Sequence, residues 1–172
     1  MKARNLALLS ALCLASPAGF AGSFEVNPIR VELTPAARAA AVTVKNSGSE
    51  PVVVQASVQS WAQQDGKDVL TATSEVLVSP PIATIQPGGA QIVRVGLRRA
   101  PDDRRQLSYR LFLQEVPPPP RPGFQGLQVA LRIGLPVFVQ PRSGPAKADL
   151  VWNARLRDPG TISLRLENNG NG

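Results

Sequence analysis

Histidine is absent from this 172-residue chain, and cysteine occurs once, at Cys13. These absences remove the commonest general base, the thiol nucleophile and the usual zinc ligands from consideration. Acidic residues are scattered, and the only adjacent pair, Asp102-Asp103, lies in a charged turn with Arg104 and Arg105. The composition therefore favours a protein that is not an enzyme, holds no metal and needs no cofactor.

The chain also lacks an apolar run long enough to cross a bilayer. The run Leu6–Ala15 follows Lys2 and Arg4, and small residues come after it around Gly19-Phe20-Ala21. A spanning helix needs about 20 apolar residues, whereas this arrangement is typical of a cleavable secretory signal. We expect residues 1–21 to be a signal peptide, and the product to reach the periplasm of a Gram-negative bacterium without stable membrane insertion.

Removal of that segment would also remove Cys13, so packing alone would have to stabilise the exported chain. The whole chain has 19 basic and 12 acidic residues, a formal net charge of +7. A basic balance can indicate nucleic-acid binding. No five-residue run is mostly basic, however, and the chain has only one Tyr and five Phe for base stacking. We expect a positively charged surface and no nucleic-acid partner.

Alternating apolar residues between turn-forming residues predict β-strands through most of the chain. The Asp65-Gly66 pair predicts a tight hairpin turn. No window after the signal peptide shows a helical period. Seven strands with turns every 8–12 residues predict an all-β fold, an antiparallel immunoglobulin-like β-sandwich. The expected strands cover residues 24–33, 41–45, 52–61, 69–78, 92–97, 107–116 and 127–139.

The last of these strands carries an unusual apolar face. Five prolines, at 117–120 and 122, precede the stretch GLQVALRIGLPVFVQP, in which every odd position from Leu127 to Val139 is apolar. Proteins normally interrupt such a face on an exposed strand with charge, proline or a bulge, because it promotes aggregation. Two interpretations stay open: the face packs on the protein's own core, as we expect for Val137 and Val139, or it covers the core of another protein.

Five segments in a fixed order carry a resemblance to a known family. They read NPIRVEL, VKNSGSEPVVVQASVQSW, VSPPIATIQPGGAQIVRV, LSYRLFLQEVPP and LQVALRIGLPVF. Together they resemble the first domain of the PapD-like periplasmic pilus-assembly chaperones of the chaperone–usher pathway. The resemblance implies a signal peptide at 1–21, the immunoglobulin-like chaperone domain at 22–141, and a linker with a partial second domain at 142–172.

The resemblance also implies a mechanism. A pilus or fimbrial subunit of this pathway is an immunoglobulin-like domain without its last strand, and the chaperone lends a strand that fills the gap. The chaperone then delivers the subunit to an outer-membrane usher. In this chain the residues that match the donor strand are Leu127, Val129, Leu131 and Ile133.

In the resembling family, a pair of basic residues binds the terminal carboxylate of the subunit. Arg30 matches the first-strand arginine of that pair. The family's lysine is missing, because the corresponding stretch reads Gly134-Leu135-Pro136, and Arg132 on the same even-numbered face is the candidate to replace it. Arg94 and Glu115 match residues of an internal salt-bridge network, so their implied role is structural.

The C-terminal part holds two more apolar runs, at 150–152 and 161–167, which are typical of the opening strands of a second sandwich. Residues 145–172 are too few for an independent fold, which usually needs about 40 or more. We therefore expect the second domain to be incomplete. The alternative function is a secreted immunoglobulin-like adhesive or structural module, which would fill its own core and expose no apolar edge.

Overall fold

A computed structural model describes residues 24–120, 122–123 and 125–172 of the chain. The predicted signal peptide, its cleavage site and Cys13 lie outside the described residues. Within the described part all regular elements are β-strands. No helix there is long and apolar enough to cross a membrane.

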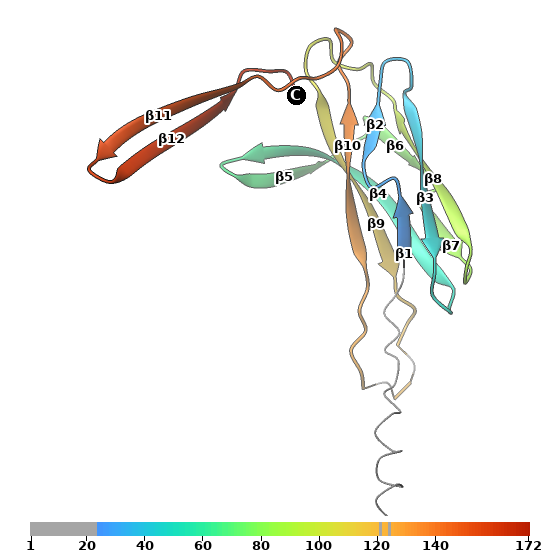
Figure 1. Cartoon of the computed structure of the whole chain (residues 1–172). Coiled ribbons are helices and arrows are strands. Elements are labelled where there is room, and N and C mark those ends of the chain that lie inside the picture. The colour runs from blue at the N-terminus through green and yellow to red at the C-terminus, as the bar shows by residue number, and fades with distance from the viewer. Residues whose placement is uncertain (1–23, 121, 124) are drawn as a thin grey trace, which may run out of the picture.

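Ten strands form two sheets that pack face to face (Figure 1). All pairs are antiparallel except that of β2 with β10. The predicted all-β, immunoglobulin-like sandwich is therefore confirmed. The first sheet has the order β1 (Phe24–Asn27), β3 (Ala39–Asn46), β8 (Ala90–Leu97) and β6 (Val76–Ser79). The second has the order β2 (Val31–Leu33), β10 (Arg132–Val139), β9 (Leu107–Val116), β4 (Val52–Gln64) and β5 (Lys67–Ala72), with β7 (Ile82–Ile85) also paired to β4.

Two of the expected strands are divided between the sheets. The run at 24–33 forms β1 in the first sheet and β2 in the second, with Pro28, which has no N–H to donate to a ladder, between them. The run at 69–78 divides in the same way into β5 and β6. The turn at Asp65-Gly66 is confirmed, since both residues have positive φ, 51° and 73°, as a tight hairpin of β4 with β5 requires.

The core lies between the sheets and consists of the inward-facing residues of each strand. Val137 and Val139 are 0% exposed, so their predicted place in the protein's own core is confirmed. Alternate residues of β9 are buried in the same way, from Tyr109 to Leu113. Consequently the even-numbered residues of β9 and β10 form the outer face of the second sheet.

A polar contact joins the two sheets at one end of this core. The hydroxyl of Tyr109 donates a hydrogen bond of 2.7 Å to the Glu75 carboxylate, which also forms an ion pair of 2.5 Å with Arg99. Burial raises the pKa of Tyr109, and the hydrogen bond from Tyr109 lowers the pKa of Glu75. The contact holds the segment before β6 against β9, and its role is structural.

The last two strands lie apart from the sandwich (Figure 1). β11 (Leu150–Asp158) and β12 (Thr161–Asn168) form a separate two-stranded sheet. Every side chain of β11 is exposed. The hairpin is tied back through Asn171, whose carbonyl accepts a hydrogen bond of 3.0 Å from the Gln106 N–H and whose side-chain amide donates one of 2.9 Å to the Arg104 carbonyl.

Candidate functional site

The predicted donor residues lie where the strand pairing of β10 with β9 ends. Strand β10 begins only at Arg132, so the expected strand at 127–139 is shorter than predicted. Only Glu115 and Val116 of β9 extend past Gln114, the partner of Arg132, and the four prolines that follow lack an N–H. Leu127 is 88% exposed and Val129 is 68% exposed. Residues 126–131 are therefore an extended, apolar and largely exposed segment, here called the donor segment.

The donor segment is attached to β9 at one point. The Glu115 N–H donates a hydrogen bond of 2.8 Å to the Leu131 carbonyl, and the Leu131 N–H donates one of 3.2 Å to the Glu115 carboxylate. Leu131 is half-buried. Ile133, two residues further along the chain, packs against the protein's own core. Leu127 and Val129 are thus exposed, whereas Leu131 and Ile133 are partly buried.

One edge of β10 is also open. β2 pairs with β10 only from Val137 to Val139. On that side, the described residues offer no strand partner to Arg132–Pro136. The donor segment and the open edge of β10 together form a stretch from 126 to 136 that has no strand partner on this side among the described residues, and it ends where β2 begins.

Two neighbouring aromatic rings on the outer face of the second sheet each support an arginine. The guanidinium carbon of Arg30 lies 4.7 Å from the Phe138 ring centroid, and that of Arg110 lies 3.9 Å from the Trp61 ring. The Phe138 and Trp61 rings are 6.2 Å apart and tilted by 47°. Such stacking restricts the side-chain freedom of an arginine while leaving its fork of N–H donors available. We call these four residues the arginine–aromatic row.

Strand register places Arg30 and Arg110 on either side of Pro136. Arg110 is paired with Pro136 across β9 and β10. Arg30 immediately precedes Val31, whose partner on β10 is Val137, the residue after Pro136. The two arginines therefore lie on either side of β10 at this level, Arg30 just before β2 and Arg110 on β9, about 10 Å apart at the backbone.

Arg132 lies elsewhere on this face. It is four residues from Pro136 along β10, about 13 Å away, and its guanidinium lies 4.0 Å from the Phe112 ring centroid. Gly134 lies between these levels, where a Cβ would come within 3.2 Å of the Phe112 ring and 3.4 Å of the Arg110 side chain. The glycine therefore allows both side chains to lie close against β10.

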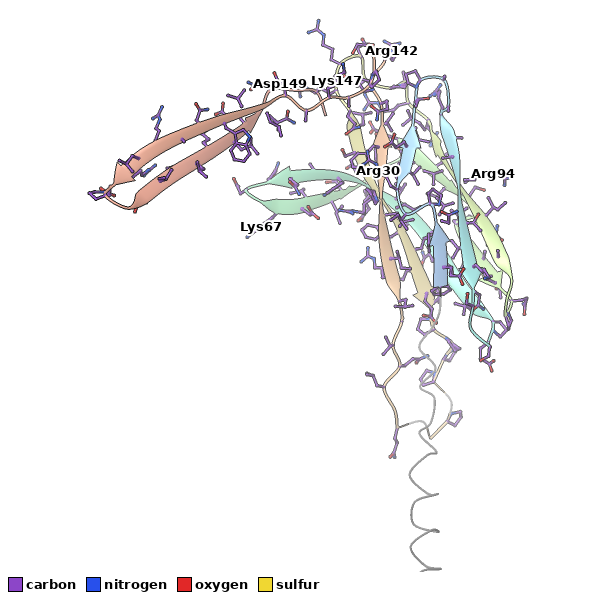
Figure 2. The ribbon with its side chains drawn as sticks, in the orientation of Figure 1. Arg30, Lys67, Arg94, Arg142, Lys147 and Asp149 are labelled. Carbon is purple, nitrogen blue, oxygen red and sulfur yellow. The ribbon has the colours of Figure 1, made fainter. Side chains whose placement is uncertain are left out.

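The structure places Arg94 and Glu115 on different sheets, so they do not pair with each other, and their part in a salt-bridge network stays a prediction. Arg94 is exposed on β8 in the first sheet, at the far side of the sandwich from Arg30 (Figure 2). Glu115 belongs to β9 in the second sheet and contacts Leu131 instead. Matching positions one by one could not reveal this, because the two residues lie on different sheets and Arg94 points outward between the buried Val93 and Val95.

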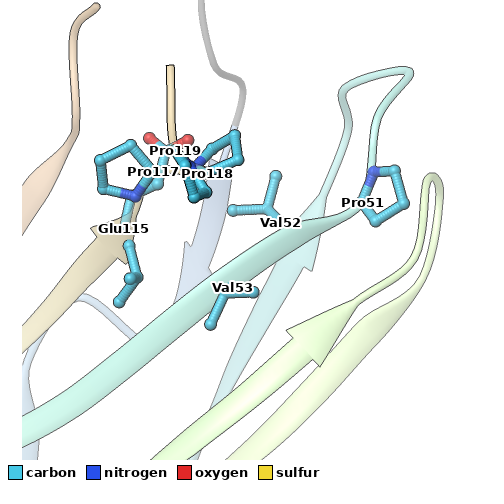
Figure 3. A pocket seen from close by; sticks show the side chains of 8 residues that line it. Pro51, Val52, Val53, Glu115, Pro117, Pro118 and Pro119 are labelled. Carbon is cyan, nitrogen blue, oxygen red and sulfur yellow. The ribbon is translucent and has the colours of Figure 1, made fainter. Parts of the chain in front are cut away.

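A pocket of about 290 Å³ lies beside the start of the donor segment (Figure 3). Its wall is mostly apolar and comes from the beginning of β4 and the end of β9 with the prolines that follow. Glu115 is the one ionisable residue in the wall. The lining residues are Pro51, Val52, Val53, Glu115, Val116, Pro117, Pro118 and Pro119.

The sequence interpretation missed three members of the outer face, Arg110, Trp61 and Phe138. The alternation of β9 around the buried Tyr109 and Leu111 indicates that Arg110 points outward. Its proximity to Arg30 depends on the order β2-β10-β9 and on the register of both pairs, which no local pattern encodes.

Comparison with known proteins agrees with this architecture. Residues 23–145 match the PapD N-terminal domain family, described as pili and flagellar-assembly chaperones, and the chain belongs to this family. Chaperone protein PapD of Escherichia coli is 28% identical over 102 residues, which are 57% of this chain and 41% of PapD. Chaperone protein FimB/FhaD of Bordetella pertussis is 29% identical over 164 residues, 88% of this chain and 66% of that protein. The chain thus spans less than two thirds of either relative.

A similar chain also occurs in the solved structure of a chaperone–subunit complex. A chain of the CsuC–CsuE chaperone–tip adhesion subunit pre-assembly complex, from the archaic chaperone–usher Csu pili of Acinetobacter baumannii, superimposes with a TM-score of 0.70. It is 27% identical, and the match covers 87% of this chain and 73% of that one. The fold is therefore that of a pilus-assembly chaperone domain.

Proposed function

We propose that this protein is a periplasmic chaperone that caps pilus or fimbrial subunits by lending them a strand and delivers them to an outer-membrane usher. The observation that carries the proposal is the donor segment, in which Leu127 and Val129 are 88% and 68% exposed beside an open strand edge. A protein without a partner would be expected to protect such an edge. Membership of the chaperone family and the likeness to a chaperone–subunit complex support it.

The donor side chains would supply much of the binding free energy. Fully burying an aliphatic side chain contributes about 1.5–3 kcal/mol. Given the exposed fractions of Leu127 and Val129, their burial in a subunit groove contributes about 2–5 kcal/mol in total, before the cost of ordering the segment. Leu131 and Ile133 add less, because both are already partly covered by the protein itself.

The arginines would determine the direction of the bound strand. A strand added to the open edge of β10 must stop where β2 begins, beside Arg30. If that strand runs parallel to β10, its C-terminal carboxylate arrives at the arginine, which can bind it through two charge-assisted hydrogen bonds. An antiparallel strand would bring a positively charged N-terminus there instead, and like charges would repel.

Several further assignments belong to the same proposal. Residues 1–21 are a signal peptide, 22–141 the subunit-binding domain, and 142–172 a linker with part of a second domain. The protein acts without a cofactor and catalyses no reaction. It is not stably inserted in a membrane.

Periplasmic co-expression with an immunoglobulin-like pilus subunit that lacks its last strand tests the proposal. The subunit should co-purify with the protein in a 1:1 complex. The matched control is the same subunit with the missing strand fused to its end, which fills its own groove and should not be captured. Equal capture of both forms, or of neither, would instead favour an immunoglobulin-like adhesive or structural module.

A further inference from the structure

Glu115 is an acidic side chain at the end of β9, on the side of that strand which otherwise faces the core. The odd-numbered residues before it, Tyr109, Leu111 and Leu113, are buried, and alternation along the strand places Glu115 on the same side. Glu115 is half-buried. None of the ion pairs among the described residues includes it. The structure therefore shows a half-buried carboxylate in line with apolar side chains.

Glu115 also ends the pairing of β9 with the donor segment. The Glu115 N–H donates a hydrogen bond of 2.8 Å to the Leu131 carbonyl, so the two residues face each other as a hydrogen-bonded pair of the ladder. In such a pair the Leu131 N–H would donate to the Glu115 backbone carbonyl, but here it donates to the carboxylate, at 3.2 Å. This bond does not require a charge, because the side-chain carbonyl of a glutamine is an equivalent acceptor.

Beyond Glu115 the β9 side of the donor segment is open. By the same register the next hydrogen-bonded pair would join Val129 to Pro117, and proline has no N–H. Among the described residues no strand pairs with Val129 on this side. A strand of a captured subunit that pairs here would lie in line with β9, and its end would meet Val116 and Pro117. The side chains at that end would come close to Glu115.

The pocket of about 290 Å³ beside Glu115 has a lining that suits a basic side chain (Figure 3). Its wall is mostly apolar, and Glu115 is the one ionisable residue among the lining residues. Lysine and arginine can lay their aliphatic stems along an apolar surface while the charged group reaches a carboxylate. An acidic side chain would be repelled there. An apolar side chain would exclude water from the carboxylate without pairing it, which is costly.

We propose that Glu115 and the pocket beside it bind a lysine or arginine side chain of the captured subunit, at the end of the subunit strand that pairs with the donor segment in line with β9. This inference rests on the proposed function, because it concerns how a subunit meets this end of the sandwich. Capture excludes water from the pocket, and the carboxylate then accepts a charge-assisted hydrogen bond. Subunits that carry a basic residue at this place bind more tightly than subunits without one, so Glu115 contributes to the choice of partner.

A double-mutant cycle with a co-expressed pilus subunit that lacks its last strand tests this assignment. In the subunit, each lysine and arginine of the first and last strands is replaced by methionine, one at a time. Relative affinity is obtained by expressing two differently tagged forms of the protein with a limiting amount of subunit. Glu115→Gln keeps the acceptor for the Leu131 N–H and removes the charge. It should lower capture by at least about tenfold, the factor expected for a hydrogen bond to a charged group. One methionine replacement should cause a similar loss with the wild type and little further loss with Glu115→Gln.

Glu50→Gln is the matched control, because Glu50 is exposed and directly precedes Pro51 but does not line the pocket. Its capture should stay within about twofold of the wild type. Glu115→Lys should lose the unmodified subunit and regain capture of a subunit in which the identified basic residue is replaced by glutamate. Thermal unfolding of each variant verifies that the sandwich is intact.

The outcomes separate this assignment from the proposed function. If Glu115→Gln captures the subunit as well as the wild type does, or if no replacement in the subunit is coupled to it, the assignment of Glu115 is overturned while strand donation stands. If the wild type captures no subunit, the proposed function fails, and the assignment of Glu115 fails with it.

Discussion

Replacing Val129 with aspartate should abolish subunit capture without unfolding the protein. Val129 is 68% exposed in the free chain, so a charged side chain there meets mostly water and the sandwich should keep its stability. In a complex, about two thirds of the side chain would become newly buried, which contributes about 1–2 kcal/mol, or a five- to thirtyfold change in affinity. An aspartate forfeits this contribution and also requires an unpaired carboxylate to be buried or protonated. Capture should therefore fall by at least about thirtyfold.

The measurement is the amount of subunit recovered per mole of purified protein, with the melting temperature recorded for each variant. Ala130→Asp is the matched control, because Ala130 is the next residue, is also exposed and lies on the opposite side of an extended strand. Its recovery should stay within about twofold of the wild type. Equal recoveries from the two variants would show that the alternation of the donor segment does not determine binding, and would refute this reasoning.

Four further predictions concern stability. Tyr109→Phe should cost about 1–2 kcal/mol in urea unfolding, because a partly buried hydrogen bond to a carboxylate is lost; an unchanged midpoint would contradict this. The contribution of Glu75 should be present above its unfolded pKa of 4.5 and be lost as the pH falls through its lowered folded pKa, so Glu75→Gln should destabilise at pH 7 and progressively less in acid. Leu111→Ala should cost about 2–5 kcal/mol, since Leu111 is fully buried. Limited proteolysis should cleave within 150–168 before it cleaves the sandwich, because the hairpin buries little apolar surface; even cleavage along the chain would refute this.

Alternation was a sufficient guide to the fold class because each strand of the sandwich has one buried face. β9 illustrates this, with Tyr109, Leu111 and Leu113 buried at every second position. What alternation could not show was which sheet a strand joins. The run at 24–33 looks like one strand in the sequence, yet its two halves pair with β3 and with β10, because pairing depends on partners far along the chain.

The same distinction applies to the site. The donor segment is a local feature, visible as an unbroken apolar series after a group of prolines, and its exposure in the structure agrees with that interpretation. The environment of Arg110 is not local. It needs Trp61 of β4 and Pro136 of β10, which come near Arg110 only after the sheet has formed. For the same reason, no local pattern indicates that Arg94 and Glu115 lie on different sheets.

Hydrogen exchange at the donor segment tests the central claim most directly. In the free protein, the amides of Leu127 and Val129 lie in an exposed segment outside any strand, so they should exchange rapidly. In a complex with a pilus subunit that lacks its last strand, these amides and those on the open edge of β10 should become strongly protected, while amides of β3 and β8 should change little. Rapid exchange at 127–131 in a stable 1:1 complex would show that the subunit is held by some other surface, and would contradict strand donation.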